Sequence, residues 1–182
     1  MAERLIELTP APATKKIAFI DLEASGLGSK SWPVEVGFAF IEGAPQSTLI
    51  RPDATWSDEA WDKGAEALHG LTRAELDRDG QNIRDVCRSL NKSLAGAEVY
   101  SDAPDWDGFW LFRLFMAANM RQQFAVHDFG KLIRPIAGSR EGELQERAAR
   151  LAPRRHRTND DVRHLQTLYG LAVENCGPRL TR

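Results

Sequence analysis

Apolar runs and alternating segments predict a sheet early in the chain. The run Ile17–Ile20 is continuously apolar and predicts a buried strand that leads into Asp21. Residues 34–41 (VEVGFAFI) alternate well enough for a second strand, and residues 47–50 predict a short third strand. Glycine and proline mark short turns between these segments, so we expect an antiparallel meander.

The rest of the chain predicts helices alternating with two more strands. Apolar residues at helical spacing predict an amphipathic helix over 82–95. Capping signals at Ser57 and Thr72 predict shorter helical turns before it, and residues 97–101 and 124–127 predict strands. Further helices are expected at about 106–120, 141–152 and 159–170. This order predicts an α/β fold with a mixed central sheet.

Length and charge limit the classes of protein to consider. At 182 residues the chain is expected to form one domain over residues 16–182, preceded by an arm over 1–15. No stretch approaches the ~20 apolar residues of a membrane span, and the start lacks the pattern of a secretory signal, so a cytoplasmic location is expected. The formal charge of −2 argues against a general nucleic-acid-coating protein, but not against an enzyme that holds a few nucleotides.

The cysteines do not predict a metal or disulfide site. Cys87 and Cys176 are far apart and have no metal-binding spacing. Cys87 lies on an apolar stripe with helical spacing, which predicts a buried structural thiol.

Asp21 and Glu23 form the first candidate metal-binding pair. Side chains repeat every two residues along a strand, so both carboxylates point to the same side where the apolar strand ends. Hard oxygen ligands suit Mg²⁺ or Mn²⁺. The alternative is a solvated strand end that happens to carry two acids.

Helical geometry separates Asp107 from its acidic neighbours. Trp110 and Leu111 lie on the apolar stripe of the predicted helix. Asp107 is three and four positions before them, so its side chain is expected at the core-facing edge of the same helix. Asp105 fits an N-cap and Asp102 a loop. A carboxylate on the buried side is costly without a cation. The alternative is that all three acids decorate a helix start.

His156 and Asp161 form the third candidate segment. Thr158 or Asn159 is expected to cap the last helix, which leaves His156 on the preceding loop and Asp161 on the apolar face. A histidine there can take a proton from an attacking water, because its ordinary pKa is near 6.5. The alternative is an ordinary surface histidine beside basic residues.

Together these residues suit two-metal phosphodiester cleavage. Two divalent ions roughly 3.5–4 Å apart would stabilise the attacking hydroxide and the leaving 3′ oxygen of an in-line displacement. The four carboxylates are about what two such ions need before a substrate phosphate is added.

With these residues in place, the chain resembles the DEDDh subgroup of the DnaQ-like 3′–5′ exonucleases, within the ribonuclease H-like superfamily. Its four candidate acids match the acidic positions of that family, and His156, five residues before the last acid, matches the histidine that names the subgroup. The segment SWPVEVGFAF looks like the second strand, and ALHGLTRAEL looks like the His-Gly-Ile-Thr segment. The second motif departs from the family, with Trp106 where phenylalanine is commoner and no asparagine upstream.

The resemblance covers roughly residues 16–170 and implies a fold, a reaction and partners. It implies a five-stranded mixed sheet, with three antiparallel and then two parallel strands, flanked by helices. It also implies two Mg²⁺ (or Mn²⁺) ions and removal of nucleoside 5′-monophosphates, one at a time, from single-stranded 3′ ends of RNA or DNA. Relatives are often dimers, so the resemblance allows a homodimer.

Substrate-binding candidates near the first motif follow from the resemblance alone. Ser25 and Leu27 lie in the segment that wedges against the terminal base in the family. His69 matches a residue that reaches a backbone phosphate, or it simply occupies a turn before Gly70.

Aromatic and basic residues near the other motifs are further substrate-binding candidates. Trp106 offers a stacking surface for bases, as do Trp32 and Trp110, although Trp110 has a core position on its helix. Arg155, with Arg154 and Arg157, flanks His156 and either holds phosphates or belongs to a solvated loop.

The leading hypothesis is therefore a metal-dependent 3′–5′ exonuclease. One alternative is a non-catalytic interaction module on the same fold, which would bind oligonucleotides without binding two divalent ions. Another is a structural cation site in a protein that acts on no polymer.

Overall fold

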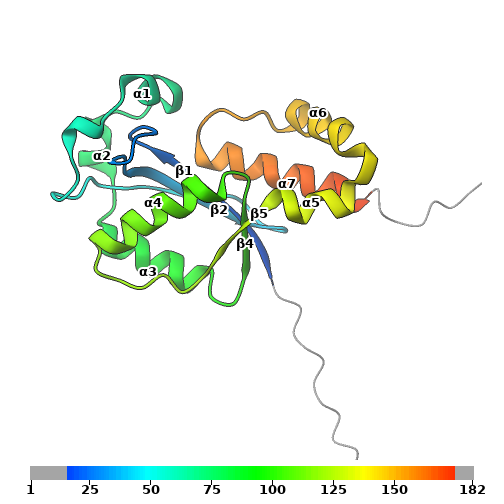
Figure 1. The fold of residues 1–182 in the computed structure, drawn as a ribbon, viewed down its shortest axis with the longest axis horizontal. Coiled ribbons are helices and arrows are strands. Elements are labelled where there is room, and N and C mark those ends of the chain that lie inside the picture. The colour runs from blue at the N-terminus through cyan, green and yellow to red at the C-terminus, as the bar shows by residue number, and fades with distance from the viewer. Residues whose placement is uncertain (1–15, 175–182) are drawn as a thin grey trace, which may run out of the picture.

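The structure is a computed structural model that describes residues 16–174 (Figure 1). The expected arm over residues 1–15 and Cys176 lie outside the described residues. Among the described residues, no helix has the length and apolar character needed to cross a membrane.

A five-stranded mixed sheet forms the centre of the molecule, as expected. Its strands are β1 (Ile17–Ala24), β2 (Pro33–Phe40), β3 (Gln46–Leu49), β4 (Glu98–Ser101) and β5 (Val126–Asp128). The spatial order is β3-β2-β1-β4-β5. β1 to β3 pair antiparallel, whereas β4 pairs parallel with both β1 and β5. This is the ribonuclease H-like arrangement.

Helices cover both faces of the sheet. They are α1 (Lys63–His69), α2 (Arg73–Asp79), α3 (Ile83–Ser93), α4 (Pro104–Ala117), α5 (Phe129–Ala137), α6 (Glu141–Leu151) and α7 (Thr158–Glu174), with short 3₁₀ turns η1 (Asp58–Ala60) and η2 (Gly138–Arg140). Figure 1 shows α3 and α4 on one side and α5, α6 and α7 on the other.

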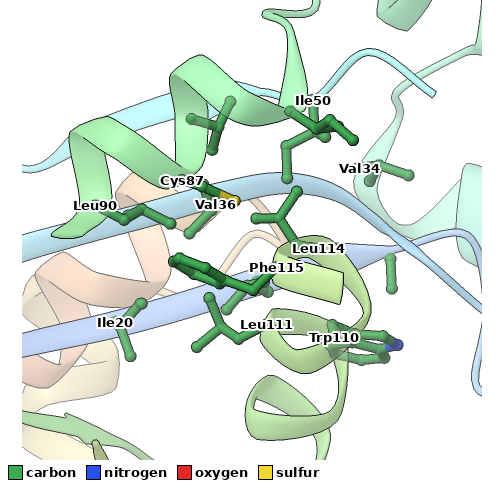
Figure 2. Close-up of a cluster of buried hydrophobic side chains, with 14 of the residues drawn as sticks. Ile20, Val34, Val36, Ile50, Cys87, Leu90, Trp110, Leu111, Leu114 and Phe115 are labelled. Atoms are coloured by element: carbon green, nitrogen blue, oxygen red, sulfur yellow. The ribbon is translucent and has the colours of Figure 1, made fainter. Parts of the chain in front are cut away.

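Two apolar clusters lie on opposite faces of the sheet. The larger one joins alternate residues of β1 and β2 to α3 and α4, and Figure 2 shows Ile20 and Val36 there beside Cys87 and Leu111. The smaller one packs Phe19 against residues of α5, α6 and α7. Cys87 is fully buried, which confirms the prediction of a structural thiol.

Local sequence signals explain several helix starts and mislead at others. Thr72 forms the predicted capping box with Glu75, and Ser57 caps only the short turn η1. Asp105 is not an N-cap, because α4 begins at Pro104 after Ala103. Proline suits this first helical position, since its missing N–H would have no partner there.

Helix α5 was not among the predicted elements. Pro135 and Gly130 interrupt the helical signal, yet the side chain of Asp128 accepts a hydrogen bond from the Gly130 N–H at 2.7 Å and caps the helix. Phe129 and Ile133 then lie one turn apart and pack into the smaller cluster. Tertiary packing outweighs the local breakers here.

Candidate metal centre

The sheet topology brings the first two motifs to one edge. β1 and β4 run parallel, so their carboxyl ends meet at the same edge of the sheet. Asp21 and Glu23 lie near the end of β1, and α4 begins shortly after β4. Asp107 therefore lies in the first turns of a helix that starts beside the acidic pair.

Asp21 and Glu23 lie on the same side of β1 in a largely buried setting. The Asp21 side chain is buried, and Glu23 is half-buried. Burial raises the pKa of Glu23 to about 8, with further contributions from the charges of Asp161, Glu35 and Asp107. Burial, followed by repulsion from Asp107 and Asp161, also raises the pKa of Asp21 well above its usual range.

Asp107 is the most buried of the candidate acids, at 1 % exposure, whereas Asp105 is exposed. The prediction that Asp107 lies on the core-facing side of its helix is therefore confirmed. Asp107 accepts a hydrogen bond from the Leu22 N–H at 3.2 Å and another from the Ser101 hydroxyl. Burial raises its pKa to about 7, although these hydrogen bonds oppose the shift.

Glu23, His156 and Asp161 are brought together from β1, the α6–α7 loop and α7. One ligand atom from each lies within 4.8 Å of the others. Asp161 is buried and accepts a hydrogen bond from the Arg155 N–H at 3.3 Å, and burial raises its pKa. His156 is exposed on the loop with a left-handed φ of 54°. Asp160, by contrast, is only half-buried.

The donor set fits divalent cations. Asp21 Oδ2 is buried and has no hydrogen-bond partner. The charges of Asp107 and Asp161 raise the pKa values of Asp21 and Glu23, although burial is the largest cause at both. An unpaired buried carboxylate oxygen is costly. Hard divalent ions with oxygen ligands would offset that cost, so the residues present suit the Mg²⁺ or Mn²⁺ that the resemblance implies.

Two ion pairs hold the loop that carries His156. Arg154 pairs with Asp102, which lies in the β4–α4 loop as expected. Arg157 forms a bidentate pair with Glu35 of β2, a buried residue that sequence reasoning did not single out. The only available signal was a charged residue inside an otherwise apolar strand, at position 35 of VEVGFAF.

Helix α7 begins at Thr158, so the expected caps at Thr158 and Asn159 are wrong. The Thr158 N–H donates instead to Glu35 Oε2 at 3.1 Å. The carbonyl of Arg157 accepts the first helical hydrogen bonds, which places Arg157 at the cap position.

A pocket beside Glu23 is lined by three of the substrate-binding candidates, Leu27, His69 and Trp110. Its volume is about 290 Å³, and Glu23, Leu27, Leu68, His69 and Trp110 are among its lining residues. Leu27 is 68 % exposed, so an apolar side chain is accessible at the edge of the candidate metal centre, in the pocket that Glu23 also lines. This is a favourable contact surface for a base.

His69 is buried, and its imidazole ring favours the neutral form. Burial lowers its pKa, and its Nδ1 accepts a hydrogen bond from the Leu71 N–H at 3.0 Å, so the proton resides on Nε2. That Nε2 lies near the Ala24 carbonyl without a hydrogen bond of good geometry. Ser25 is also buried, and its hydroxyl accepts from the Trp32 N–H at 3.0 Å, which closes the loop after β1.

The tryptophan candidates occupy different environments. Trp106 is 39 % exposed and stacks on Trp110, with ring centroids 5.4 Å apart. Trp110 is buried, as its helical position predicted, and its Nε1–H donates to the Ser31 hydroxyl. Trp32 is buried against Trp56, so of the three only Trp106 presents an open ring edge. Arg155 is exposed beside the acids.

Comparisons with known proteins find this arrangement among solved nuclease structures. No protein-family model and no curated protein matches the sequence. E. coli exonuclease I in complex with a dT13 oligonucleotide matches with a TM-score of 0.71 at 14 % identity, over 92 % of this chain and 42 % of that chain. The zinc-bound exonuclease I–ssDNA complex matches with a TM-score of 0.67 at 16 % identity, over 91 % and 42 % respectively. The chain spans less than half of these exonuclease I chains and shares their fold.

Proposed function

We propose that this protein is a metal-dependent 3′–5′ exonuclease that releases nucleoside 5′-monophosphates from single-stranded nucleic acid. The observation that carries the proposal is the convergence of four buried or half-buried carboxylates from β1, α4 and α7 beside His156. One of them, Asp21, has an unpartnered buried oxygen. Folding alone gives no reason to gather these charges. Burial raises the pKa values of Asp21 and Glu23, so the ionised carboxylates destabilise the folded protein.

Each residue of the centre has a proposed role. Asp21, Glu23, Asp107 and Asp161 would hold two Mg²⁺ or Mn²⁺ ions, which supply charge stabilisation to an in-line displacement at phosphorus when bound. His156 takes the proton of the attacking water, since it is exposed and lies within 4.8 Å of ligand atoms of Glu23 and Asp161.

The substrate class rests on the resemblance and on the fold. The exonuclease I structures that share the fold hold single-stranded oligonucleotides such as dT13. We propose that the terminal base lies in the pocket at Leu27 and that Trp106 and Arg155 contact the strand. His69 lines that pocket, and Ser25 is buried and accepts a hydrogen bond from the Trp32 N–H, so it fixes the loop that carries Leu27.

The test is digestion of matched DNA and RNA oligomers, labelled at the 3′ or the 5′ end, with Mg²⁺ or Mn²⁺. A ladder shortening from the 3′ end, with mononucleotide products, is expected for the wild type and not for Asp161→Asn. A wild type that releases no mononucleotides, or an Asp161→Asn variant equal to it, would refute the proposal. Oligonucleotide binding without cleavage and without binding of two divalent ions would instead support a non-catalytic module.

A further inference from the structure

Glu35 and Arg157 form an ion pair that the proposed reaction does not use. Arg157 donates from Nε to Glu35 Oε2 at 3.1 Å and from Nη2 to Oε1 at 2.9 Å. The Glu35 side chain is only 2 % exposed, and that of Arg157 is 42 % exposed. Two parallel hydrogen bonds fix both the distance and the orientation of the guanidinium group.

The same carboxylate also fixes the start of helix α7. Glu35 Oε2 accepts a hydrogen bond from the Thr158 N–H at 3.1 Å. Glu35 therefore caps the N-terminus of α7 from the neighbouring strand β2, as an N-cap side chain would do from within the helix. The helix start is pressed closely onto the strand, since a Cβ at Gly37 would lie 2.5 Å from the Thr158 hydroxyl oxygen. Asp161 follows in the first turn of this helix, and its N–H donates to the Arg157 carbonyl at 3.0 Å.

His156 directly precedes this anchored residue and has a strained backbone. A left-handed φ of 54° is unfavourable for a residue with a Cβ and persists only where the surroundings enforce it. The Arg154–Asp102 pair lies on one side of His156 and the Arg157–Glu35 pair on the other. The backbone at His156 is therefore held between two fixed points.

We propose that the Glu35–Arg157 pair is a positioning device for His156 and Asp161. Glu35 stands opposite Glu23 in the register of β1 and β2. The pair thus ties the loop of the base and the helix of one metal ligand to β2, the strand that pairs with β1, which carries Asp21 and Glu23. This inference rests on the proposed function, because the placement of a base matters only to an enzyme that uses it.

The first test is Arg157→Lys in the wild type and in a His156→Ala background. Lysine keeps the charge but loses the fork geometry. We expect kcat to fall about 10- to 100-fold in the wild type with little change in KM. In the His156→Ala background we expect a clearly smaller loss, because the base that is positioned has been removed and only the effect on Asp161 remains.

A matched control is available where η2 meets α6. Arg140 makes the same bidentate contact with Glu143, at 3.1 and 3.0 Å, on an exposed helix surface. Arg140→Lys is expected to leave kcat unchanged.

A second readout requires neither metal nor activity. Trypsin cleavage after Arg155, followed by mass spectrometry, reports release of the loop. Cleavage is expected to be faster in Arg157→Lys and Glu35→Gln than in the wild type and in Arg140→Lys. If thermal melting shows that Glu35→Gln does not fold, the comparison of tryptic cleavage between Arg157→Lys, Arg140→Lys and the wild type tests the proposal without it.

The outcomes separate this inference from the proposed function. A wild type that releases no nucleotides refutes the proposed function and the positioning role with it. An active wild type in which Arg157→Lys lowers kcat equally in both backgrounds, or leaves tryptic cleavage unchanged, refutes the positioning role alone.

Discussion

The two faces of β1 have similar burial and opposite chemistry. One face carries Ala18, Ile20 and Leu22 into the larger apolar cluster below α3 and α4. The other begins with Phe19 in the smaller cluster and continues with Asp21 and Glu23. Burial of the apolar face stabilises the fold, at about 25 cal/mol per Å² of apolar surface. Burial of the acidic face opposes folding, since the pKa values of both acids are raised.

This difference assigns separate tasks to the two faces. Packing of the apolar face drives burial of the strand, whereas burial of the carboxylates on the acidic face lowers the stability of the folded protein. Residues that lower stability while suiting a cation are typical of functional sites. Substitutions on the two faces should therefore have opposite effects on stability and on activity.

The largest effect is expected for Asp21→Asn on the acidic face. Loss of a metal ligand removes several kcal/mol of transition-state stabilisation, so nucleotide release should fall roughly 10³-fold or more. The melting temperature of the metal-free protein should stay equal or rise, because a charge that repels Asp107 and Asp161 is removed. Single-turnover hydrolysis and thermal melting measure the two quantities. Loss of activity and stability together would show that Asp21 is a structural acid.

Ile20→Ala tests the apolar face. Ile20 is fully buried, and removing its side chain should lower the free energy of unfolding by about 2–5 kcal/mol. The kcat of the remaining folded protein should change little, because Ile20 points away from the carboxylates. Denaturant unfolding provides the measurement, with Met116→Ala as a control, since Met116 is 63 % exposed on α4. A stable Ile20→Ala protein without activity would contradict the division between faces.

The metal-free protein should become less stable as the pH rises. The pKa values of Glu23 and Asp107 are raised from 4.5 to about 8 and from 3.8 to about 7. The unfolded chain therefore releases these protons at lower pH than the folded chain, and the stability present at low pH is lost as the pH rises through the folded values. We expect the melting temperature to fall by roughly 5–10 °C between about pH 5 and pH 8.

Divalent ions should flatten this pH dependence. Mg²⁺ and Mn²⁺ bind the ionised carboxylates and so favour the folded state at high pH. Melting curves in chelator and in each ion, at both ends of the pH range, test the prediction. A melting temperature that is independent of pH in chelator would mean that burial and mutual repulsion do not raise the pKa values of Glu23 and Asp107 in the folded protein.

The smallest effect is expected for Leu27→Ala, which lies on neither buried face. Stability should change by less than about 0.5 kcal/mol, because the side chain is largely exposed. KM for an oligonucleotide should rise about fivefold, which corresponds to about 1 kcal/mol of lost contact with the terminal base. An unchanged KM would remove Leu27 from the proposed binding pocket.

Residues with strong local periodicity could be placed from the sequence. The period of two in a strand put Asp21 and Glu23 on one side, and the helical period distinguished buried Asp107 from exposed Asp105. Helix α5 escaped prediction because its local signals oppose a helix and its packing against Phe19 outweighs them.

The sequence by itself determined the strand order along the chain, the buried faces and the types of side chain at the candidate centre. These depend on backbone geometry and on a few neighbouring residues. Only the tertiary structure decided that Glu35 meets Arg157, 122 positions away, and that Asp107 accepts a hydrogen bond from Leu22, 85 positions away. Such contacts depend on how packed elements cross in space, and no local pattern encodes that crossing.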